Sequence, residues 1–357
     1  MKTQHTISML TLALLFGPFA LGAQNRQVTH NESGIYEAFP DVCRLADGEL
    51  VAVFYAGYGH VSLPKADAPK GGRICLMRSK DNGRTWSEPV ALVDLDGDDR
   101  DPSIMQTKQG TLFCSFMTYH GRAEVPVSFV VRVMRSFDQG KTWEAPLVVP
   151  SPFKTVTATS SPIIELADGT LLLPVYGRDT PSRHAEDKPG LRDRTAVLRS
   201  TDGGRTWGDP VMIDEEPDVH LMEPSLLEMD DGHLLCVMRS QATQSFSSDG
   251  GRTWSIPTPI GHRADCPYLV QTTGGTILCG IRHQKETSVI VSSDRAATWS
   301  EPLRIDTRPG AYPSIVELDD GRMLCLYYGE FEKGKKSVIR QAIFRITQGP
   351  GIEFEEQ

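Results

Sequence analysis

Residues with catalytic or anion-binding side chains recur at two fixed places in a repeated pattern of this chain. The pattern is x-Pro followed by apolar residues. A Gly follows the Pro by eight residues in five copies and by seven in the remaining one, the third along the chain. The residues before the prolines are Phe39, Asp101, Ser161, Glu223, Cys266 and Tyr312. Fifteen residues after the proline, two successive copies carry Arg239 and Arg282. Carboxyl groups transfer protons and guanidinium groups bind anions through a planar fork, so these places carry more polar function than packing requires.

These side chains need strands that bring them to a common edge. Each copy predicts a strand, a tight turn such as Ala46–Gly48 and a returning strand such as Leu50–Phe54. Because the strands of a hairpin run in opposite directions, the first begins and the second ends at the same edge. The residues at the two places are therefore expected to surround one opening.

A second motif, Ser-x-Asp-x-Gly-x-Thr-Trp, alternates with the first and is called the Asp box below. It occurs at Ser79–Trp86, Ser136–Trp143, Ser200–Trp207, Ser247–Trp254 and Ser292–Trp299, the last with Ala296 in place of Gly. Asp and Gly favour a tight turn, and we expect each Trp to pack against the next element of its own repeat. Catalysis does not need five copies of one residue set, so we assign the Asp boxes to structure.

Together the two motifs predict about four strands in each of six units, whose prolines are 43 to 62 residues apart. All-β units of this size favour a six-bladed β-propeller in one domain over residues 24–357. The sixth unit has no Asp box and ends with Ser337–Ile346, and an early strand such as Gln27–Glu32 is expected to complete it. A β-sandwich is the alternative fold, but it does not explain six copies.

Composition limits the classes of function. The chain of 357 residues has 37 Lys and Arg against 46 Asp and Glu, a net charge of −9 that argues against a nucleic-acid partner. We find no metal-binding motif and expect neither a metal nor a cofactor.

Four of the seven cysteines, Cys114, Cys236, Cys279 and Cys325, fall twelve residues after a proline, in equivalent places of different units. Such residues lie too far apart to bridge, so we expect buried free thiols.

The first 23 residues have the pattern of a cleavable signal peptide. Lys2 and His5 precede an apolar run from Ile7 to Phe19, and Leu21–Ala23 offers small residues for cleavage. We therefore expect a secreted or periplasmic protein without membrane insertion after signal removal, and a monomer.

The Asp boxes and the Pro-strand units resemble those of the sialidase (neuraminidase) family over about residues 36–345. The resemblance implies a six-bladed propeller in which Tyr312 is the nucleophile and Glu223 removes its proton. It also implies that Arg239 and Arg282 are two members of a three-arginine clamp for the substrate carboxylate. The chemistry is consistent, because a phenol with a pKa near 10 needs an adjacent base.

Two features depart from the family pattern. Ala38 stands where sialidases carry the first arginine of the clamp, and Arg100 or Arg73 is the candidate replacement. The acid/base also has more than one candidate: Asp67 lies in the long loop of the first unit, where the family carries its catalytic Asp, whereas Asp101 lies at the opening. His60 is a third candidate, since an imidazole titrates near neutral pH. His60 and Asp41 are also candidate substrate-binding residues.

The resemblance predicts an exo-acting glycoside hydrolase that removes a terminal acidic sugar, such as sialic acid or a related ulosonic or uronic residue, from a glycan partner. The alternative is a carbohydrate-binding protein whose arginines hold an anionic glycan without cleavage. A structural alternative also stays open for two parts of the site. Buried Glu–Arg pairs such as Glu223–Arg239 can join neighbouring units, and Tyr312 can be a half-buried aromatic residue at the edge.

Overall fold

The Pro-strand pattern folds into antiparallel hairpins, as the sequence predicts. The computed structural model describes residues 25–122, 125–179, 192–213, 220–239, 242–347 and 351–354, and every regular element within them is a β-strand. This confirms the all-β prediction. The predicted signal peptide lies outside the described residues. Among the described residues there is no helix long and apolar enough to cross a membrane.

The tight turn of each hairpin depends on its glycine. Gly48 has a φ of 89°, a conformation that residues with a Cβ atom rarely adopt, and its N–H donates to the Leu45 carbonyl at 2.9 Å. The corresponding glycines of the other five copies have φ between 75° and 91°. The recurrence of glycine at this place in the repeat therefore reflects one turn that occurs six times.

The strands group into six successive units. The first holds β2 (Tyr36–Arg44), β3 (Leu50–Gly57), β4 (Arg73–Ser79) and β5 (Val90–Val93), and the second holds β6 (Asp98–Gln106), β7 (Leu112–Arg122), β8 (Val125–Ser136) and β9 (Leu147–Val148). The third holds β10 (Val156–Ala158), β11 (Ile164–Glu165), β12 (Leu171–Arg178), β13 (Arg194–Ser200) and β14 (Gly208–Met212), and the fourth holds β15 (Met222–Glu228), β16 (Leu234–Arg239), β17 (Thr243–Ser247) and β18 (Thr258–Pro259). The fifth holds β19 (Asp265–Gln271), β20 (Ile277–His283), β21 (Glu286–Ser292) and β22 (Leu303–Asp306), and the sixth holds β23 (Gly310–Glu317), β24 (Met323–Glu332), β25 (Lys336–Thr347), β1 (Asn25–Gln27) and β26 (Gly351–Phe354).

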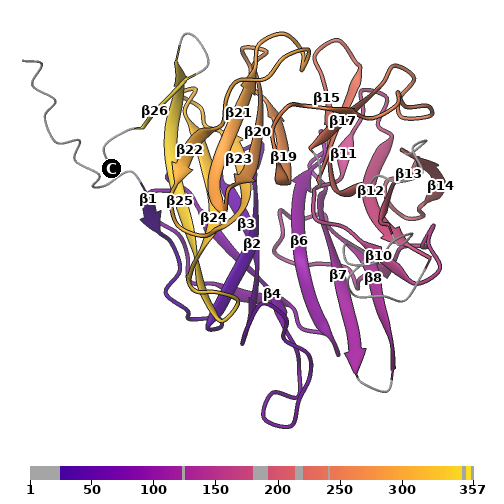
Figure 1. Cartoon of the computed structure of the whole chain (residues 1–357). Coiled ribbons are helices and arrows are strands. Elements are labelled where there is room, and N and C mark those ends of the chain that lie inside the picture. The colour runs from indigo at the N-terminus through magenta and orange to yellow at the C-terminus, as the bar shows by residue number, and fades with distance from the viewer. Residues whose placement is uncertain are drawn as a thin grey trace, which may run out of the picture.

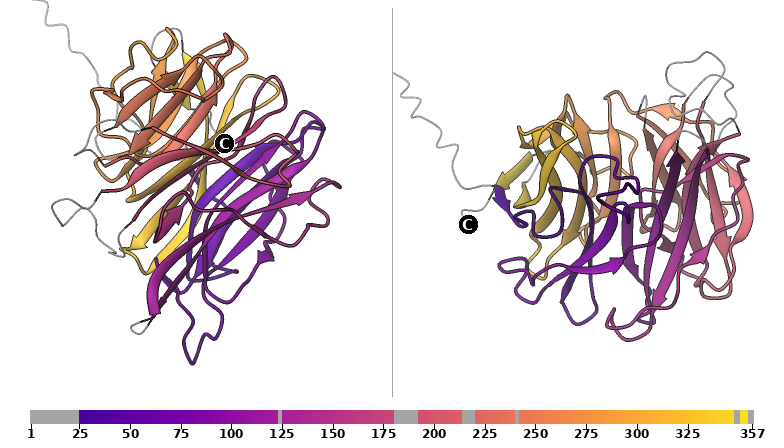
Figure 2. Two further views of the ribbon diagram at one scale, coloured as in Figure 1. Left: turned by 90° about the vertical axis from the view of Figure 1, so that its right-hand side faces the viewer. Right: turned by 90° about the horizontal axis from the view of Figure 1, so that it is seen from below.

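Hydrogen bonding joins some neighbouring units into larger sheets. The fourth and fifth units are separate four-stranded sheets, whereas the other four units form two nine-stranded sheets. Each large sheet depends on one parallel residue pair between two units, Tyr36 with Ser337 in one and Val156 with Phe129 in the other. In Figures 1 and 2, the yellow strands of the last unit lie beside the indigo strands of the first.

The hydrophobic core is divided among the contacts between units. Six buried clusters are present among the described residues, and each combines apolar side chains from two successive units. One of them joins Leu324 and Leu326 of the last unit to Leu50 and Phe54 of the first. Every unit thus packs against the one before it and the one after it, and the last packs against the first.

The Asp boxes form the same polar turn five times. In the first, the Asp81 carboxylate accepts from Ser79 Oγ at 2.8 Å, from the Thr85 amide at 2.8 Å and from Thr85 Oγ1 at 2.6 Å. The sequence predicted that the Trp of each Asp box packs within its own repeat, and this prediction is wrong. Trp86 of the first unit instead donates its indole N–H to Gln341 of the last unit at 2.8 Å and packs into the cluster shared by these two units. The reason is that the core lies between units, so the Trp is buried only by reaching the preceding one.

Two further expectations concern the early strand of the sixth unit, whose bounds differ from the prediction, and the cysteines, which agree with it. The early strand of the sixth unit is β1, which pairs with β25 and lies slightly before the predicted Gln27–Glu32, and β26 adds a second strand that the sequence did not reveal. The seven cysteines are free thiols in the structure, and all but the half-buried Cys43 are buried.

Candidate active site

The opening predicted from the repeats is built on a kink in the first strand of each unit. The residue before the proline has a left-handed backbone in five units, with φ between 46° and 53° at Phe39, Asp101, Glu223, Cys266 and Tyr312. At the same places the strand register shifts, for example between Met222 and Ser225. A β-bulge of this kind takes its residue out of the ladder and turns the side chain away from the sheet. Such conformations cost about 1–3 kcal/mol each and cluster at functional sites.

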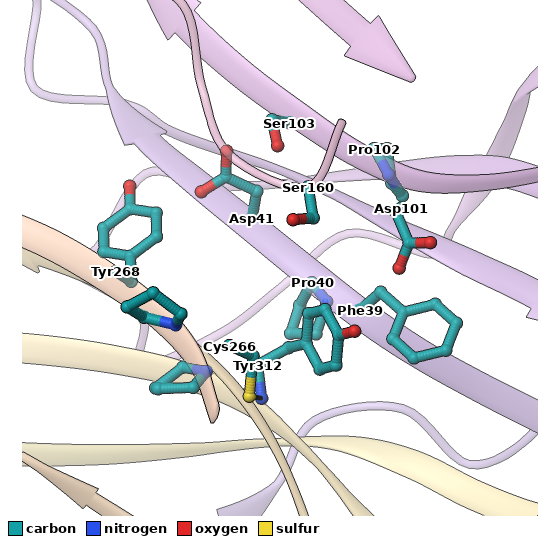
Figure 3. Close-up of a pocket in the computed structure, with 12 residues that line it drawn as sticks. Phe39, Pro40, Asp41, Asp101, Pro102, Ser103, Ser160, Cys266, Tyr268 and Tyr312 are labelled. Carbon is teal, nitrogen blue, oxygen red and sulfur yellow. Dashed lines mark hydrogen bonds between the residues drawn. The ribbon is translucent and has the colours of Figure 1, made fainter. Parts of the chain in front are cut away.

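These kinked residues contact one another from unit to unit. The Cys266 amide donates to Glu223 Oε2 at 3.1 Å, and the Tyr312 amide donates to Cys266 Sγ at 3.4 Å. The Tyr312 ring lies edge-on to the Phe39 ring, with 4.8 Å between centroids. The Arg100 guanidinium lies 5.3 Å from the centroid of the Phe39 ring. The fourth, fifth, sixth, first and second units therefore bring their kinks to one place, as Figure 3 shows for Phe39, Asp101, Cys266 and Tyr312.

Tyr312, Glu223 and Arg239 form a hydrogen-bonded triad at this place. The Tyr312 hydroxyl donates to Glu223 Oε1 at 2.6 Å, and Arg239 Nη1 donates to the same oxygen at 2.7 Å. Burial raises the pKa of Tyr312 well above its ordinary value of 10, and the neighbouring Glu223 carboxylate raises it further. The phenol is therefore protonated at neutral pH and has its acceptor already in position.

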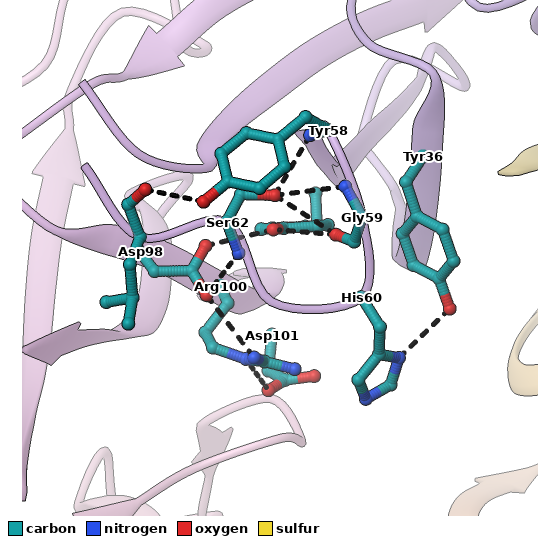
Figure 4. Close-up of polar contacts among 10 residues, drawn as sticks. Tyr36, Tyr58, Gly59, His60, Ser62, Asp98, Arg100 and Asp101 are labelled. Carbon is teal, nitrogen blue, oxygen red and sulfur yellow. Dashed lines mark hydrogen bonds and ion pairs between the residues drawn. The ribbon is translucent and has the colours of Figure 1, made fainter. Parts of the chain in front are cut away.

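Asp101 is held by Arg100 and keeps one oxygen without a partner. Arg100 Nε donates to Asp101 Oδ2 at 3.2 Å, while Arg100 Nη1 lies 3.4 Å from Asp98 Oδ2. Asp98 also accepts from the Tyr55 hydroxyl and the Ser62 amide, which fixes it (Figure 4). Asp101 is 4% exposed, and its Oδ1 has no hydrogen-bond partner among the described residues. Burial raises the pKa of Asp101 to about 6, because the opposing effect of Arg100 is smaller.

A cavity of about 450 Å³ lies next to the triad. Asp101, Glu223, Arg239 and Tyr312 line one part of it. The remaining wall is mostly apolar and aromatic and includes Met117, Tyr119, Phe129, Val156, Ala158, Tyr176 and Met222. The volume is in the range of small-molecule sites, and an apolar wall with a few convergent polar groups is their usual composition. A second cavity of about 20 Å³ lies among the kinks and shares Asp101 and Tyr312 with the larger one.

His60 lines the cavity from the loop that follows β3. The Tyr36 hydroxyl donates to Glu330 at 2.8 Å, so His60 Nδ1–H donates to the Tyr36 oxygen at 3.0 Å (Figure 4). Burial and the nearby Arg100, Arg282 and Arg239 lower the pKa of His60 to about 4. The imidazole is thus neutral at neutral pH, which corrects the expectation that it titrates there.

Three other candidate residues lie elsewhere or serve another purpose. Asp67 does not reach the cavity, because its loop projects into solvent; its side chain is 78% exposed and 3.3 Å from Lys65 Nζ. Arg73 donates to the Ser33 carbonyl and lines a different surface hollow, so it does not fill the place of the arginine missing at Ala38. Asp41 is buried and accepts from the Ile104 and Val42 amides and from Ser314 Oγ, which joins the second and sixth units to the first.

Arg100 is thus the candidate replacement that lies at the cavity, although it forms ion pairs with two carboxylates of the protein. Arg282 is near the triad but pairs with Asp265, its Nε lying 3.6 Å from Asp265 Oδ2. The sequence reasoning missed Asp265 and also missed Arg178, which lines the cavity and donates to both oxygens of Asp193 at 3.0 Å. Arg178 ends the second strand of its hairpin, as Arg239 does, and this register could have revealed it. Asp265 stands two residues before its proline, as Arg100 does.

The described residues contain no group of three or more His, Cys, Asp or Glu side chains placed to hold a metal ion. The arrangement instead offers a phenol with a base, a second carboxyl group of raised pKa, and several guanidinium groups. This set is suited to acid/base and nucleophilic chemistry on a polar organic molecule.

Comparison with known proteins places this fold among sialidase-like structures. The family described as BNR repeat-like domain matches residues 96–325, so the chain belongs to that family, within the sialidase and BNR-repeat superfamily. A protein of unknown function from Dyadobacter fermentans has 22% identity and a TM-score of 0.74, with coverage of 93% of this chain and 100% of that chain.

Two sialidase structures are also similar. The NanB sialidase of Streptococcus pneumoniae has 15% identity and a TM-score of 0.69, covering 90% of this chain and 70% of that one. The intramolecular trans-sialidase of Ruminococcus gnavus has 15% identity and a TM-score of 0.67, covering 92% and 99%. At these identities the similarity establishes a shared fold. Among curated proteins, none matches the chain.

Proposed function

We propose that this protein is a glycoside hydrolase of the sialidase type that removes a terminal sugar from a glycan. The observation that carries the proposal is the 2.6 Å hydrogen bond from the Tyr312 hydroxyl to Glu223, at the end of a cavity large enough for a small molecule. A protein that only binds sugars has no need of a buried phenol paired with a base. The similarity to solved sialidases supports the same chemistry.

In the proposed first step, Tyr312 Oη attacks the anomeric carbon and forms the glycosyl–oxygen bond while its proton passes to Glu223. Asp101, protonated at or below its pKa of about 6, gives a proton to the oxygen of the departing group. In the second step, Asp101 takes a proton from water, which attacks the anomeric carbon and releases the sugar. Glu223 returns its proton to Tyr312, and the site is restored. Asp101 serves better than Asp67 because it lines the cavity together with Tyr312.

We propose that a terminal acidic sugar, as the sequence predicted, is among the substrates, because Arg239 lines the cavity and Arg282 lies beside Asp265 at its edge. Guanidinium groups bind carboxylates through charge-assisted hydrogen bonds.

Substitution of the triad tests the proposal. Tyr312→Phe keeps the ring against Phe39 and removes the nucleophile, so kcat should fall by about three orders of magnitude or more. Glu223→Gln should cost a comparable amount, and the double variant little more, because the two residues act as one unit. Release of sugar from sialylated and uronate-bearing glycans is the assay. Tyr312→Phe with near-wild-type turnover and an unchanged melting temperature would rule out the Tyr mechanism.

One observation favours a second candidate function, a binding protein for anionic glycans. Arg239 donates to Glu223 Oε1, the same oxygen that accepts from Tyr312, so this carboxylate is also the ion-pair partner of an arginine, a role that needs no catalysis. Glycan binding that survives in both triad variants, with no turnover in the wild type, would identify the binding protein.

We also propose that the six units are the blades of one closed propeller over residues 24–357. Six clusters between successive units, including one between the last and the first, support a ring. An experimental structure with another number of units, or with the first and last units apart, would contradict it.

A further inference from the structure

The carboxylate of Asp265 lies among three arginines at the edge of the candidate site. Its Oδ1 is 3.4 Å from Arg239 Nε and 3.3 Å from Arg263 Nε, and its Oδ2 is 3.6 Å from Arg282 Nε. The Asp265 side chain is 9% exposed, whereas Arg263 is 68% exposed and lies at the surface. The protein therefore already supplies an anion to Arg239 and Arg282, the two arginines expected to bind a substrate carboxylate.

These contacts place a negative charge beside the donor groups by which an arginine binds an anion. A guanidinium group binds a carboxylate best through two parallel N–H donors. Arg239 Nε lies 3.4 Å from Asp265 Oδ1 and Arg239 Nη1 donates to Glu223 Oε1, so this guanidinium group lies between two carboxylates of the protein. Arg282 Nε lies 3.6 Å from Asp265 Oδ2, within ion-pair distance. A ligand carboxylate that approached either arginine would also meet the negative charge of Asp265 at close range.

The other arginines of the cavity are compensated in the same way. Arg100 lies between Asp98 and Asp101, and Arg178 donates to both oxygens of Asp193. Every arginine at the cavity, whether it lines the wall or adjoins it like Arg282, therefore has a carboxylate of the protein within 3.6 Å. Among these groups Asp265 is the one shared by Arg239 and Arg282, so it controls how much positive charge remains for a ligand.

We propose that Asp265 is a specificity residue that cancels the charge of Arg239 and Arg282, so that the site binds a neutral sugar about as well as its acidic counterpart. The inference rests on the proposed function only in taking the cavity as the sugar site. Recognition then depends on hydroxyl groups and on the apolar wall, while acidic sugars remain within the range of ligands.

The test compares ligands that differ only in charge. N-acetylneuraminic acid and its methyl ester form one pair, and glucuronic acid and glucuronamide form another, each measured by calorimetry or NMR titration. In the wild type we expect the two affinities of a pair to agree within about threefold. In Asp265→Asn, which keeps the shape and removes the charge, we expect the preference for the acid to rise about tenfold or more, and to weaken with added salt.

Asp306→Asn is the matched control. Asp306 is also a buried carboxylate paired with an arginine, Arg340, at 3.2 Å, but it does not line the cavity. This variant loses the same charge from the protein and should keep the wild-type ratio of affinities. Melting temperatures of both variants establish that they are folded.

Several results would overturn the proposal. One is a wild type that binds the acid at least tenfold more tightly than its neutral counterpart. Another is an affinity ratio that does not change in Asp265→Asn, or an affinity for the acid that does not increase there. A third is an equal change of the ratio in Asp306→Asn. The outcome is separate from the proposed function, because affinities are measured without turnover. A protein that cleaves no glycan can still show the shift in Asp265→Asn, and an active enzyme can lack it.

Discussion

At the scale of single residues, Asp101 is buried with one carboxyl oxygen unpaired among the described residues, which costs folding free energy. A buried carboxyl group normally has hydrogen bonds to both oxygens, because an unpaired buried polar atom costs about 1–3 kcal/mol. Asp101 Oδ1 has none among the described residues, and the group faces the cavity with a pKa of about 6. A raised pKa at such a place is typical of a group that gives and takes protons.

We therefore predict that activity depends on pH through Asp101. Above about pH 6 the group loses its proton, so kcat/KM should decline with rising pH on the best substrate found. Asp101→Asn should lower the rate about 10²- to 10⁴-fold and abolish this alkaline decline. His60→Asn is the control, since the pKa of His60 is about 4 and its loss should leave the decline in place. A decline that persists in Asp101→Asn would assign it to another group.

The candidate residues that the repeats located are the ones the structure brings together. Asp101, Glu223 and Tyr312 stand directly before a proline and Arg239 stands fifteen residues after one, and such a repeated position fixes a side chain relative to its sheet. Asp67 was chosen by its place in a long loop, and a loop without a repeated partner has no register to fix its course. Arg178 and Asp265 also stand at repeated positions, but Arg178 follows its proline by sixteen residues where Arg239 and Arg282 follow theirs by fifteen, and Asp265 stands two residues before its proline and not directly before it.

At the scale of elements, the kinks before the prolines could not be predicted from the strand pattern. The sequence shows a residue, a proline and an apolar run, which indicates the start of a strand. It does not show that the strand has already begun and is interrupted there, as it is around Glu223. The left-handed backbone is sustained by contacts from neighbouring units, such as the Cys266 amide on Glu223, which appear only when the units are assembled.

The third Asp box offers a test of local backbone strain with a control next to it. Gly203 and Gly204 have φ of 74° and 76°, but a Cβ atom at Gly203 would meet nothing within 4 Å, whereas one at Gly204 would lie 2.3 Å from the Phe113 ring. Gly203→Ala should lower the free energy of unfolding by about 1–2 kcal/mol through the left-handed backbone alone.

Gly204→Ala should cost about 1–3 kcal/mol more, because the buried Phe113 must move. Denaturant unfolding measures both. Equal losses for the two variants would mean that the Asp-box turn does not pack as tightly on the preceding unit as described. Activity per folded molecule should change in neither variant, since neither glycine lies at the cavity.

At the scale of the whole molecule, two groups of carboxylates oppose each other in their effect on stability. Burial raises the pKa of Asp41 and of Asp101 to about 6, above their unfolded value near 4. The folded state then binds protons more tightly, so stability should rise as the pH falls from 6 to 4. Hydrogen bonds within the Asp boxes lower the pKa of Asp138 and Asp249 to about 2. Their contribution is complete above pH 4 and is lost as the pH falls toward 2.

In His60→Asn, which removes the opposing effect of an imidazole whose pKa is lowered to about 4, we predict a melting temperature that is higher at pH 5 than at pH 7.5 and that drops below pH 4. Thermal unfolding followed by fluorescence or calorimetry at constant ionic strength measures it. Asp101→Asn should reduce the difference between pH 5 and pH 7.5, because one of the raised groups is gone. A melting temperature that increases steadily from pH 5 to pH 7.5 would show that these carboxylates do not govern stability.

The pairing of the first unit with the last affects how the chain can be made. The Ser337 hydroxyl donates to the Glu37 carbonyl across 300 residues of sequence, and β1 pairs with β25. On a ribosome that builds the chain from its N-terminus, β1 and β2 must wait for nearly the whole of translation before these partners exist. Until then the edge of β2 is open, and an open strand edge pairs readily with other chains. The first unit therefore meets its partners in the last only at the end of synthesis, and until then its open edge is exposed to pairing with other chains.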